Sequence, residues 1–195
     1  NTLTIPTFTV DTTVPVTTAP VISGIISGTY TTSQIFTVSG ESGATIEYSL
    51  DGGSTWTAYT AEVTLTSDGS YMITARQSVA GNVSANATSI TVVIDKTAPT
   101  LSSVSIASNN STTTLAKVAD VVTLTFTASE TIATPVVTFQ SGGAAITDTS
   151  ITYASSGNVW TAAYTANASD TDGSVTYSIA FSDSAGNAGT AVTSG

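Results

Sequence analysis

The sequence contains no cysteine and no histidine. Without cysteine there is neither a disulfide framework nor a thiolate metal site. Without histidine the chain lacks the commonest general base and the commonest ligand of transition metals. An enzyme built from this chain would have to use carboxylates alone, and no spacing brings two glutamates together as a glycosidase pair. The four candidates are Glu41, Glu47, Glu62 and Glu130. We therefore predict that the protein is not an enzyme.

Basic residues are also scarce. Arg76, Lys96 and Lys117 stand against thirteen acidic residues, which gives a formal net charge of −10. Nucleic acids and anionic membranes are bound by basic patches, so neither is an expected partner, whereas cations are. No apolar run approaches the roughly 20 residues that span a bilayer, and no signal peptide opens the chain. We expect no membrane insertion.

Strong helix formers are scarce, and the polarity of the chain comes mostly from threonine and serine. Hydrophobic residues make up 41% of the sequence and charged residues only 8%. Threonine and valine are β-branched and suit a pleated surface. With 195 residues, the chain has the length of two β-sandwiches of about 100 residues each. The predicted fold class is all-β, with two tandem antiparallel sandwiches.

The segment Asp95-Lys96-Thr97-Ala98-Pro99 marks the junction between these two domains. It follows a run of alternating strand residues at 89–94 and precedes another at 101–106. A weaker copy, Asp11-Thr12-Thr13-Val14-Pro15, follows a short apolar run near the start. Because proline fixes φ and favours extended geometry before it, both segments are predicted to be stiff linkers. The predicted parts are residues 1–13, 14–96 and 97–195.

Each predicted domain contains six strands bounded by glycine, serine, asparagine or aspartate, at the short regular spacing of a sandwich. In the first domain they are 21–25, 35–39, 45–50, 62–66, 71–77 and 89–94. In the second they are 101–106, 121–127, 135–139, 151–153, 159–164 and 175–181. Asp51-Gly52, Asp68-Gly69 and Asp172-Gly173 mark tight turns.

The second domain is predicted to lack its closing strand. Ala80-Gly81-Asn82 matches Ala185-Gly186-Asn187, but only the first copy is followed by a full apolar strand. Residues 1–13 form an orphan strand whose apolar side chains stand in two alternating pairs, separated by a slip at Pro6-Thr7 that suits a bulge. These assembly residues are Leu3, Ile5, Phe8 and Val10.

Three arrangements of the orphan strand fit the sequence. Residues 1–13 close a preceding domain of a longer tandem array, or each subunit donates this strand to the second domain of its neighbour by β-augmentation. In the third arrangement the strand folds back within its own chain or hangs loose. The first two produce a head-to-tail filament or rod, because heterologous contacts that do not close generate open fibres.

These motifs resemble the bacterial Ig-like domain repeats of giant surface adhesins, biofilm-associated proteins and surface-layer or filament proteins. The resemblance covers nearly all of the second domain, through the junction at 95–99, the segment 120–130, Trp160-Thr161-Ala162-Ala163-Tyr164-Thr165 and Asp183-Ser184-Ala185-Gly186-Asn187. In the first domain it rests on residues 44–53 with Trp56 and Tyr59. The resemblance implies Ig-like sandwiches in an extracellular, cell-surface, non-catalytic spacer or filament module. It identifies no ligand.

Calcium is a further implication of the resemblance, because in that family linker aspartates and the Asp-x-Ala-Gly-Asn loop often hold Ca²⁺ between domains. Here Asp183 and Asn187 match the loop, and Asp11 and Asp95 match the linkers. Ser78 takes the place of Asp183 in the first domain, so Asp183 is expected to meet Asp11 of the next unit. The alternative is that these aspartates only end strands and cap turns.

The sequence therefore predicts a structural repeat unit of an extracellular filament, surface layer or adhesin stalk. Its expected partners are copies of itself, head to tail, or adjacent repeats of the same chain. The alternative from another functional class is a glycan-binding or ice-binding adhesin module, since threonine is regularly spaced on the strands. Thr-rich faces are also ordinary for exposed sandwich strands, and Trp56 and Trp160 fall within predicted sandwich elements.

Overall fold

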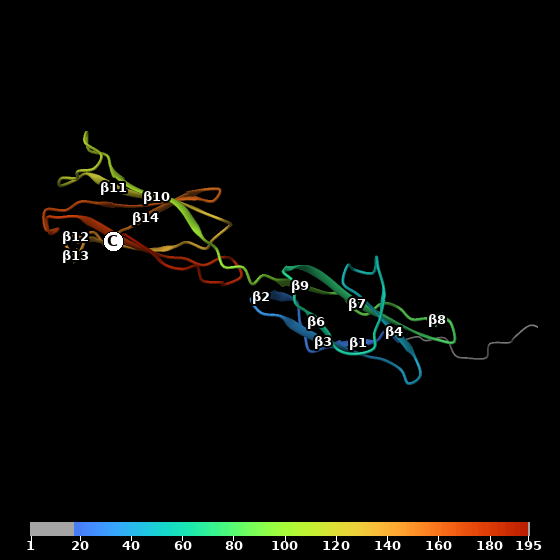
Figure 1. The fold of residues 1–195 in the computed structure, drawn as a ribbon. Helices are drawn as coiled ribbons and strands as arrows, with labels where there is room; N and C mark the ends of the chain where they lie inside the picture. Colours follow the sequence, from blue (N-terminus) through green and yellow to red (C-terminus); the bar gives the residue numbers. More distant parts are fainter. Residues whose placement is uncertain (1–17, 195) are drawn as a thin grey trace, which may run out of the picture. The chain divides into compact units, whose positions relative to one another are not determined.

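The computed structural model describes residues 18–194, and within that range every regular element is a strand. The chain divides into two units (Figure 1): unit 1 ends at Asp95 and unit 2 begins at Lys96, one residue before the boundary that the sequence predicted. The predicted assembly residues Leu3, Ile5, Phe8 and Val10, and the predicted ligand Asp11, lie outside the described residues.

Unit 1 contains two sheets. The first has the order β1-β3-β6, and the second has the order β2-β9-β7-β4-β5, with β8 paired to β7. The strands are β1 (Val21–Ser23), β2 (Gly28–Tyr30), β3 (Gln34–Ser39), β4 (Thr45–Ser49), β5 (Thr57–Ala58), β6 (Val63–Leu65), β7 (Gly69–Val79), β8 (Asn82–Val83) and β9 (Ile90–Ile94). All pairs are antiparallel except β2 with β9, which is parallel.

Unit 2 also contains two sheets, with orders β10-β11-β15-β14 and β13-β12-β16-β17. Its strands are β10 (Leu101–Ser108), β11 (Val121–Ala128), β12 (Val136–Ser141), β13 (Ala144–Ala145), β14 (Thr152–Ser156), β15 (Val159–Thr165), β16 (Val175–Ala180) and β17 (Val192–Thr193). Every pair is antiparallel.

The order of the strands identifies both units as Ig-like β-sandwiches. In an Ig sandwich the first, second, fifth and fourth strands form one sheet, and the third, sixth and seventh strands form the other. Unit 2 has this order, with β13 as an extra strand beside the third. Unit 1 departs from this order in two ways: its first sheet, β1-β3-β6, has no described strand in the fourth position, and its first strand is divided into β1 and β2, which join opposite sheets. The last strand, β9 or β17, is the closing strand.

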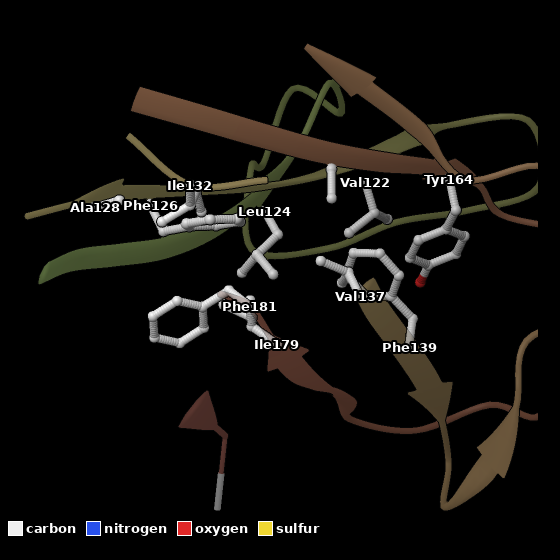
Figure 2. Close-up of a cluster of buried hydrophobic side chains, with 11 residues drawn as sticks. Val122, Leu124, Phe126, Ala128, Ile132, Val137, Phe139, Tyr164, Ile179 and Phe181 are labelled. Atoms are coloured by element: carbon white, nitrogen blue, oxygen red, sulfur yellow. The ribbon is translucent and has the colours of Figure 1, made fainter. Parts of the chain in front are cut away.

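The core of unit 2 follows from strict alternation along β11, where every second side chain is buried. Leu124 and Phe126 are fully buried there. Ile179 and Phe181 approach them from the opposite sheet (Figure 2). Because successive side chains of a strand point to opposite faces, one face of β11 supplies the core and the other faces outward. Unit 1 has its own core, which contains Phe36 and Ile73.

The twelve strands that the sequence predicted are all present, most with ends displaced by one or two residues. Five short strands were not predicted: β2, β5, β8, β13 and β17. Four of these have only two residues, which is too short for alternation to identify, and β2 has three. The strand β17 differs from the expectation that the second sandwich has no closing strand. It occupies that position but covers only two residues of β16.

Candidate functional site

The closing strand of unit 1 shows what a complete edge looks like. β9 pairs with β7 over five residues, from Ile90 opposite Ile73 to Ile94 opposite Gly69. Two of its side chains are completely buried in the core, Val92 with 0% and Ile94 with 1% of its surface exposed. The closing strand therefore contributes core side chains as well as backbone hydrogen bonds.

The closing strand of unit 2 spans two residues in the described part of the chain. β17 places Val192 opposite Ile179 and Thr193 opposite Ser178. The Ser194 N–H then donates to the Tyr177 carbonyl at 3.1 Å, and the Tyr177 N–H donates to the Ser194 hydroxyl at 2.9 Å. Backbone groups of a strand alternate between its two edges, so those of Val175 face the same edge as those of Tyr177. Among residues 18–194, none is paired with Val175 on this edge.

Matching turns relate the two edges residue by residue. Gly69 begins β7 with a φ of 154°, and Gly173, two residues before β16, has a φ of 149°. Each follows an aspartate, as the Asp-Gly turns of the sequence predicted. Val175 therefore corresponds to Tyr71, the partner of Val92. The buried positions of Val92 and Ile94 in unit 1 have no counterpart in the described part of unit 2.

An open cavity of about 700 Å³ lies at this end of unit 2. The segments 106–108, 113–118 and 166–175 line it, together with Val122, Ser141 and Tyr164. Val122 and Tyr164 belong to the buried cluster and lie at one end of it (Figure 2). Leu115 and Val118 also line the cavity and are 63% and 58% exposed. The apolar core of unit 2 thus opens towards solvent beside Val175.

The second candidate site is the loop from Asp183 to Asn187. Asp183 is only 3% exposed. Its Oδ1 accepts the N–H groups of Gly186 at 2.7 Å and Asn187 at 2.8 Å, and its Oδ2 accepts the side-chain amide of Asn187 at 2.8 Å. Burial raises the pKa of Asp183, but these hydrogen bonds outweigh it and hold the pKa below its ordinary value. The carboxylate is therefore charged at neutral pH.

Glu130 lies beside this loop. β11 ends at Ala128, and Ile132 forms a backbone bridge with Asp183. One carboxylate oxygen of Glu130 lies within 4.8 Å of one of Asp183. Ca²⁺ binds six to eight oxygens from carboxylates, carbonyls and water. The two carboxylates are the ligand type that Ca²⁺ takes, and two negative charges at this separation favour a cation between them.

Other aspartates of the chain cap turns. The Thr55 hydroxyl and N–H and the Ser49 hydroxyl donate to Asp51 and hold its pKa below the ordinary value. In unit 2 the side-chain amide of Asn110 lowers the pKa of Asp120. The Thr165 and Ser150 N–H groups lower that of Asp148. Turn capping, the alternative role raised by the sequence, accounts for these residues.

Of the predicted calcium ligands, Asp95 is the last residue of unit 1, and Asp183 and Asn187 belong to unit 2. Asp183 and Asn187 lie together and bond to each other. Asp95 directly follows β9, and its N–H donates to the Tyr30 carbonyl at 3.0 Å. The expected correspondence of Ser78 with Asp183 is wrong by one residue. Val79 pairs with Asn82, as Asp183 bonds to Asn187, so Val79 is the counterpart. The reason is that the turn of unit 2 is one residue longer.

Sequence reasoning missed Glu130 as a neighbour of Asp183, and it missed the cavity. Glu130 belongs to the segment that carried the family resemblance, but 53 positions of chain separate it from Asp183. Only the pairing of Ile132 with Asp183 brings the two together. The sequence did contain one indication of this site, because Glu130 stands two residues after β11, whose alternation is complete.

The two tryptophans, both predicted within sandwich elements, lie in different settings. Trp160 lies on β15 opposite Phe126 and packs against the core of unit 2. The Trp56 ring lies under the guanidinium of Arg76, 4.1 Å from its centroid, and the Arg76 Nε donates to Glu47 at 2.8 Å. Both tryptophans are partly buried. Trp160 is therefore part of a strand, whereas Trp56 lies in the loop between β4 and β5 with its ring against Arg76.

Comparisons with known proteins find only distant similarity. No protein-family model matches the chain, and no curated protein does. Among solved structures, a chimeric titin Z1Z2 functionalized with an exogenous peptide from decorin is 17% identical, with a TM-score of 0.31, over 91% of this chain and 94% of that one.

Two further solved structures are similar at the same level. A marsupial T cell receptor is 10% identical with a TM-score of 0.35, over 94% of this chain and 97% of that one. Dpr2 Ig1-Ig2, in complex with DIP-Theta Ig1-Ig3, is 14% identical with a TM-score of 0.35, over 89% of this chain and 63% of that one. Because these TM-scores are below 0.5, the assignment of the fold rests on the strand order described above.

No helix that is long and apolar enough to cross a membrane occurs among residues 18–194. The Ig-like sandwich is a fold that serves as a non-catalytic structural or adhesive module in many proteins. A fold by itself does not identify a function, so the two sites of unit 2 must carry the functional argument.

Proposed function

We propose that this chain is a non-catalytic structural repeat unit of an extracellular filament, surface layer or adhesin stalk. Units join head to tail, and a strand supplied by a neighbouring unit completes the second sandwich. The function is then mechanical, since the repeats set spacing and stiffness along the assembly.

The observation that carries this proposal is the difference between the two closing edges. In unit 1, β9 covers β7 over five residues and buries two side chains. In unit 2, β17 covers two residues of β16, and Val175 lies beyond its end. An exposed strand edge is a template for pairing with another chain. Such an edge suits an Ig-like unit that pairs with a neighbour, because in an isolated domain the same exposed edge would promote aggregation.

Calcium at the junction is the second part of the proposal. Asp183 and Glu130 supply two carboxylates in unit 2, and the side-chain amide of Asn187 fixes the orientation of Asp183. Asp95 and Asp11 are the proposed linker ligands, because each begins an Asp-to-Pro segment of the sequence. When bound, Ca²⁺ would neutralise part of the excess negative charge and stiffen the unit.

The test is the molar mass of the purified full chain over a concentration series, measured by light scattering with and without calcium. The proposal expects masses that rise as multiples of 19.5 kDa, and rods of increasing length in electron micrographs. Open assembly has no preferred size, whereas a closed dimer would hold one mass over the series. A chain that stays monomeric at every concentration, in both conditions, would refute head-to-tail assembly.

A further inference from the structure

The cavity of unit 2 and the free length of β16 together have the form of a strand acceptor. We propose that residues 3–10 of a second copy of this chain occupy it, in one definite register, in place of β17. The inference rests on the proposed head-to-tail function and adds the register, the bulge and the residues that fill the cavity.

The core-facing side of β16 sets the register. Ile179 is fully buried, and Val175 and Tyr177 pack against the same core. In unit 1 the final closing-strand residue, Ile94, lies opposite Gly69, whose counterpart is Gly173. An acidic residue follows at once, and Asp11 follows Val10 in the same way. This places Val10 opposite Gly173 and Phe8 opposite Val175.

A bulge at Pro6 keeps the apolar side chains on its two sides on the same face of the strand. If Pro6 and Thr7 together face Thr176, Pro6 is the unpaired extra residue, and its missing N–H costs no hydrogen bond. Every apolar residue of the segment then faces the core of unit 2. The pairs are Leu3 with Ile179, Ile5 with Tyr177, Phe8 with Val175 and Val10 with Gly173.

The cavity receives the second half of this strand. Gly173, Ser174 and Val175 line it on one side, and the core residues Val122 and Tyr164 line it on another. Phe8 and Val10 therefore enter the space of about 700 Å³ that the core leaves open. In unit 1 the counterparts of Phe8 and Val10 are Val92 and Ile94, which are buried to 0% and 1% exposure. The cavity is the unfilled equivalent of their site.

Replacing β17 removes little buried surface from unit 2. The strand has two residues, of which Val192 is half-buried and Thr193 is exposed. The incoming segment offers four apolar side chains in the same sheet position. Burying apolar surface stabilises by about 25 cal/mol per Å², so a longer strand with more core-facing side chains displaces a shorter one.

The junction pattern makes the occupant a second copy. Asp95 follows the closing strand of unit 1 and leads directly into the next sandwich. By the same pattern, residues 3–11 close a sandwich that precedes unit 1. The chain's own unit 2 follows unit 1, so we assign these residues to unit 2 of a second copy, whose edge and cavity they fit.

Cysteine cross-linking tests the register, because the natural chain contains no cysteine. The register makes Thr9 and Ser174 a non-hydrogen-bonded pair, with Cα atoms about 4.5 Å apart, a separation that a disulfide spans. One batch of full chain carries Thr9→Cys and a second, distinguishable by mass, carries Ser174→Cys. After mixing and mild oxidation, a covalent heterodimer is expected.

The matched control replaces Ser174→Cys by Thr176→Cys, which moves the thiol to the diagonal position. Diagonal neighbours are about 7–8 Å apart, too far for an unstrained disulfide. The heterodimer is expected with Ser174→Cys and lost with Thr176→Cys. Equal yields from the two mixtures, or none from either, would overturn the register.

A second variant pair addresses the cavity without cysteine. Phe8→Ala is expected to weaken assembly by about 100-fold, since losing a buried phenylalanine costs about 3 kcal/mol or more. Thr9→Ala, whose side chain faces outward in this register, is expected to leave assembly within a few-fold of the natural chain. Equal effects of the two variants would refute the cavity as the site of Phe8.

These outcomes separate the inference from the proposed function. If the natural chain assembles but gives no register-specific cross-link, head-to-tail association remains supported and residues 3–10 are excluded as the connecting strand. If the chain neither assembles nor cross-links, both the proposed function and this inference are refuted. Cross-linking within single chains, shown by unchanged mass of a chain that carries both cysteines, would replace the second copy by the chain's own N-terminal segment and overturn the inference.

Discussion

Asn187 binds Asp183 twice, through its backbone N–H to Oδ1 at 2.8 Å and through its side-chain amide to Oδ2 at 2.8 Å. The contact closes a tight loop around a carboxylate that is almost entirely buried. A buried charge is tolerated when hydrogen bonds compensate for lost water. Glu130, within 4.8 Å, adds a second carboxylate to the same place.

Calcium is expected to stabilise unit 2. A ligand that binds only the folded state contributes about 3 kcal/mol when its free concentration is about 100 times its Kd. The melting temperature, followed by Trp160 fluorescence in a Trp56→Phe background, should rise with calcium. The rise should shrink in Glu130→Gln and persist in Asp172→Asn, a control acid elsewhere in unit 2. A rise that Glu130→Gln leaves intact would exclude Glu130 as a ligand.

Substitution of each linker aspartate tests whether it binds the calcium ion. Asp95→Asn and Asp11→Asn each remove one charge and keep the size of the side chain. The sequence-based prediction expects each variant to reduce the calcium response of the full chain. If neither changes it, the ion is held within unit 2 and the linker prediction is wrong.

Acid is expected to destabilise unit 2 more than unit 1. Burial raises the pKa of Asp170, but hydrogen bonds from the Thr147 hydroxyl and from the Asn167 and Thr147 N–H groups outweigh it and lower the pKa. A pKa that is lower in the folded state gives stability that is complete above the unfolded value, near 4, and is lost as pH falls through the folded value. Lowered pKa values occur at Asp120, Asp148, Asp170 and Asp183 in unit 2, and at Asp51 in unit 1.

Urea unfolding between pH 7 and pH 2 measures this difference. Trp160 reports unit 2 in a Trp56→Phe background, and Trp56 reports unit 1 in a Trp160→Phe background. The free energy of unfolding should fall more steeply below pH 4 for unit 2. Asp148→Asn, which cannot be protonated, should flatten its pH dependence. Identical slopes for the two units would contradict the assignment.

Gly189→Ala is expected to destabilise unit 2 by about 1–3 kcal/mol. A Cβ at this position would lie 2.1 Å from Cε2 of Phe181 and 2.7 Å from the carbonyl oxygen of Pro99. Phe181 belongs to the core, so its ring has little room to move. Thr190→Ala, at the exposed neighbouring position, is the control. The measurement is chemical unfolding monitored at Trp160, and equal stabilities for the two variants would show that the core repacks freely.

Arg76 is expected to shield Trp56. Its guanidinium lies 4.1 Å from the ring centroid and its Nε lies 2.8 Å from Glu47. Arg76→Met keeps the apolar stem, removes the charge, and should cost about 1 kcal/mol, because both contacts are partly exposed to solvent. Acrylamide quenching of Trp56, in a Trp160→Phe background, should increase. Unchanged quenching would show that the ring is protected by other groups.

The sequence by itself determined the all-β class, the two sandwiches and twelve of the strands. β11 illustrates why, since its alternation is complete from Val121 to Ala128 and local periodicity is enough to identify it. The Asp-Gly turns and the Asp-to-Pro junction are equally local, because they depend on the backbone preferences of the residues themselves. The loop from Asp183 to Asn187 was found through the resemblance of its Asp-x-Ala-Gly-Asn motif, which is also local because its contacts span four residues.

Only the tertiary structure decided what depends on distant pairing. Glu130 reaches Asp183 because Ile132 pairs with it across the sandwich. β17 forms because β16 provides an edge, although its two residues carry no pattern of their own. The cavity beside Val175 is a property of two sheets and three loops at once. Local residue preferences do not encode the register between strands far apart in the chain, so these contacts could not be derived from the sequence.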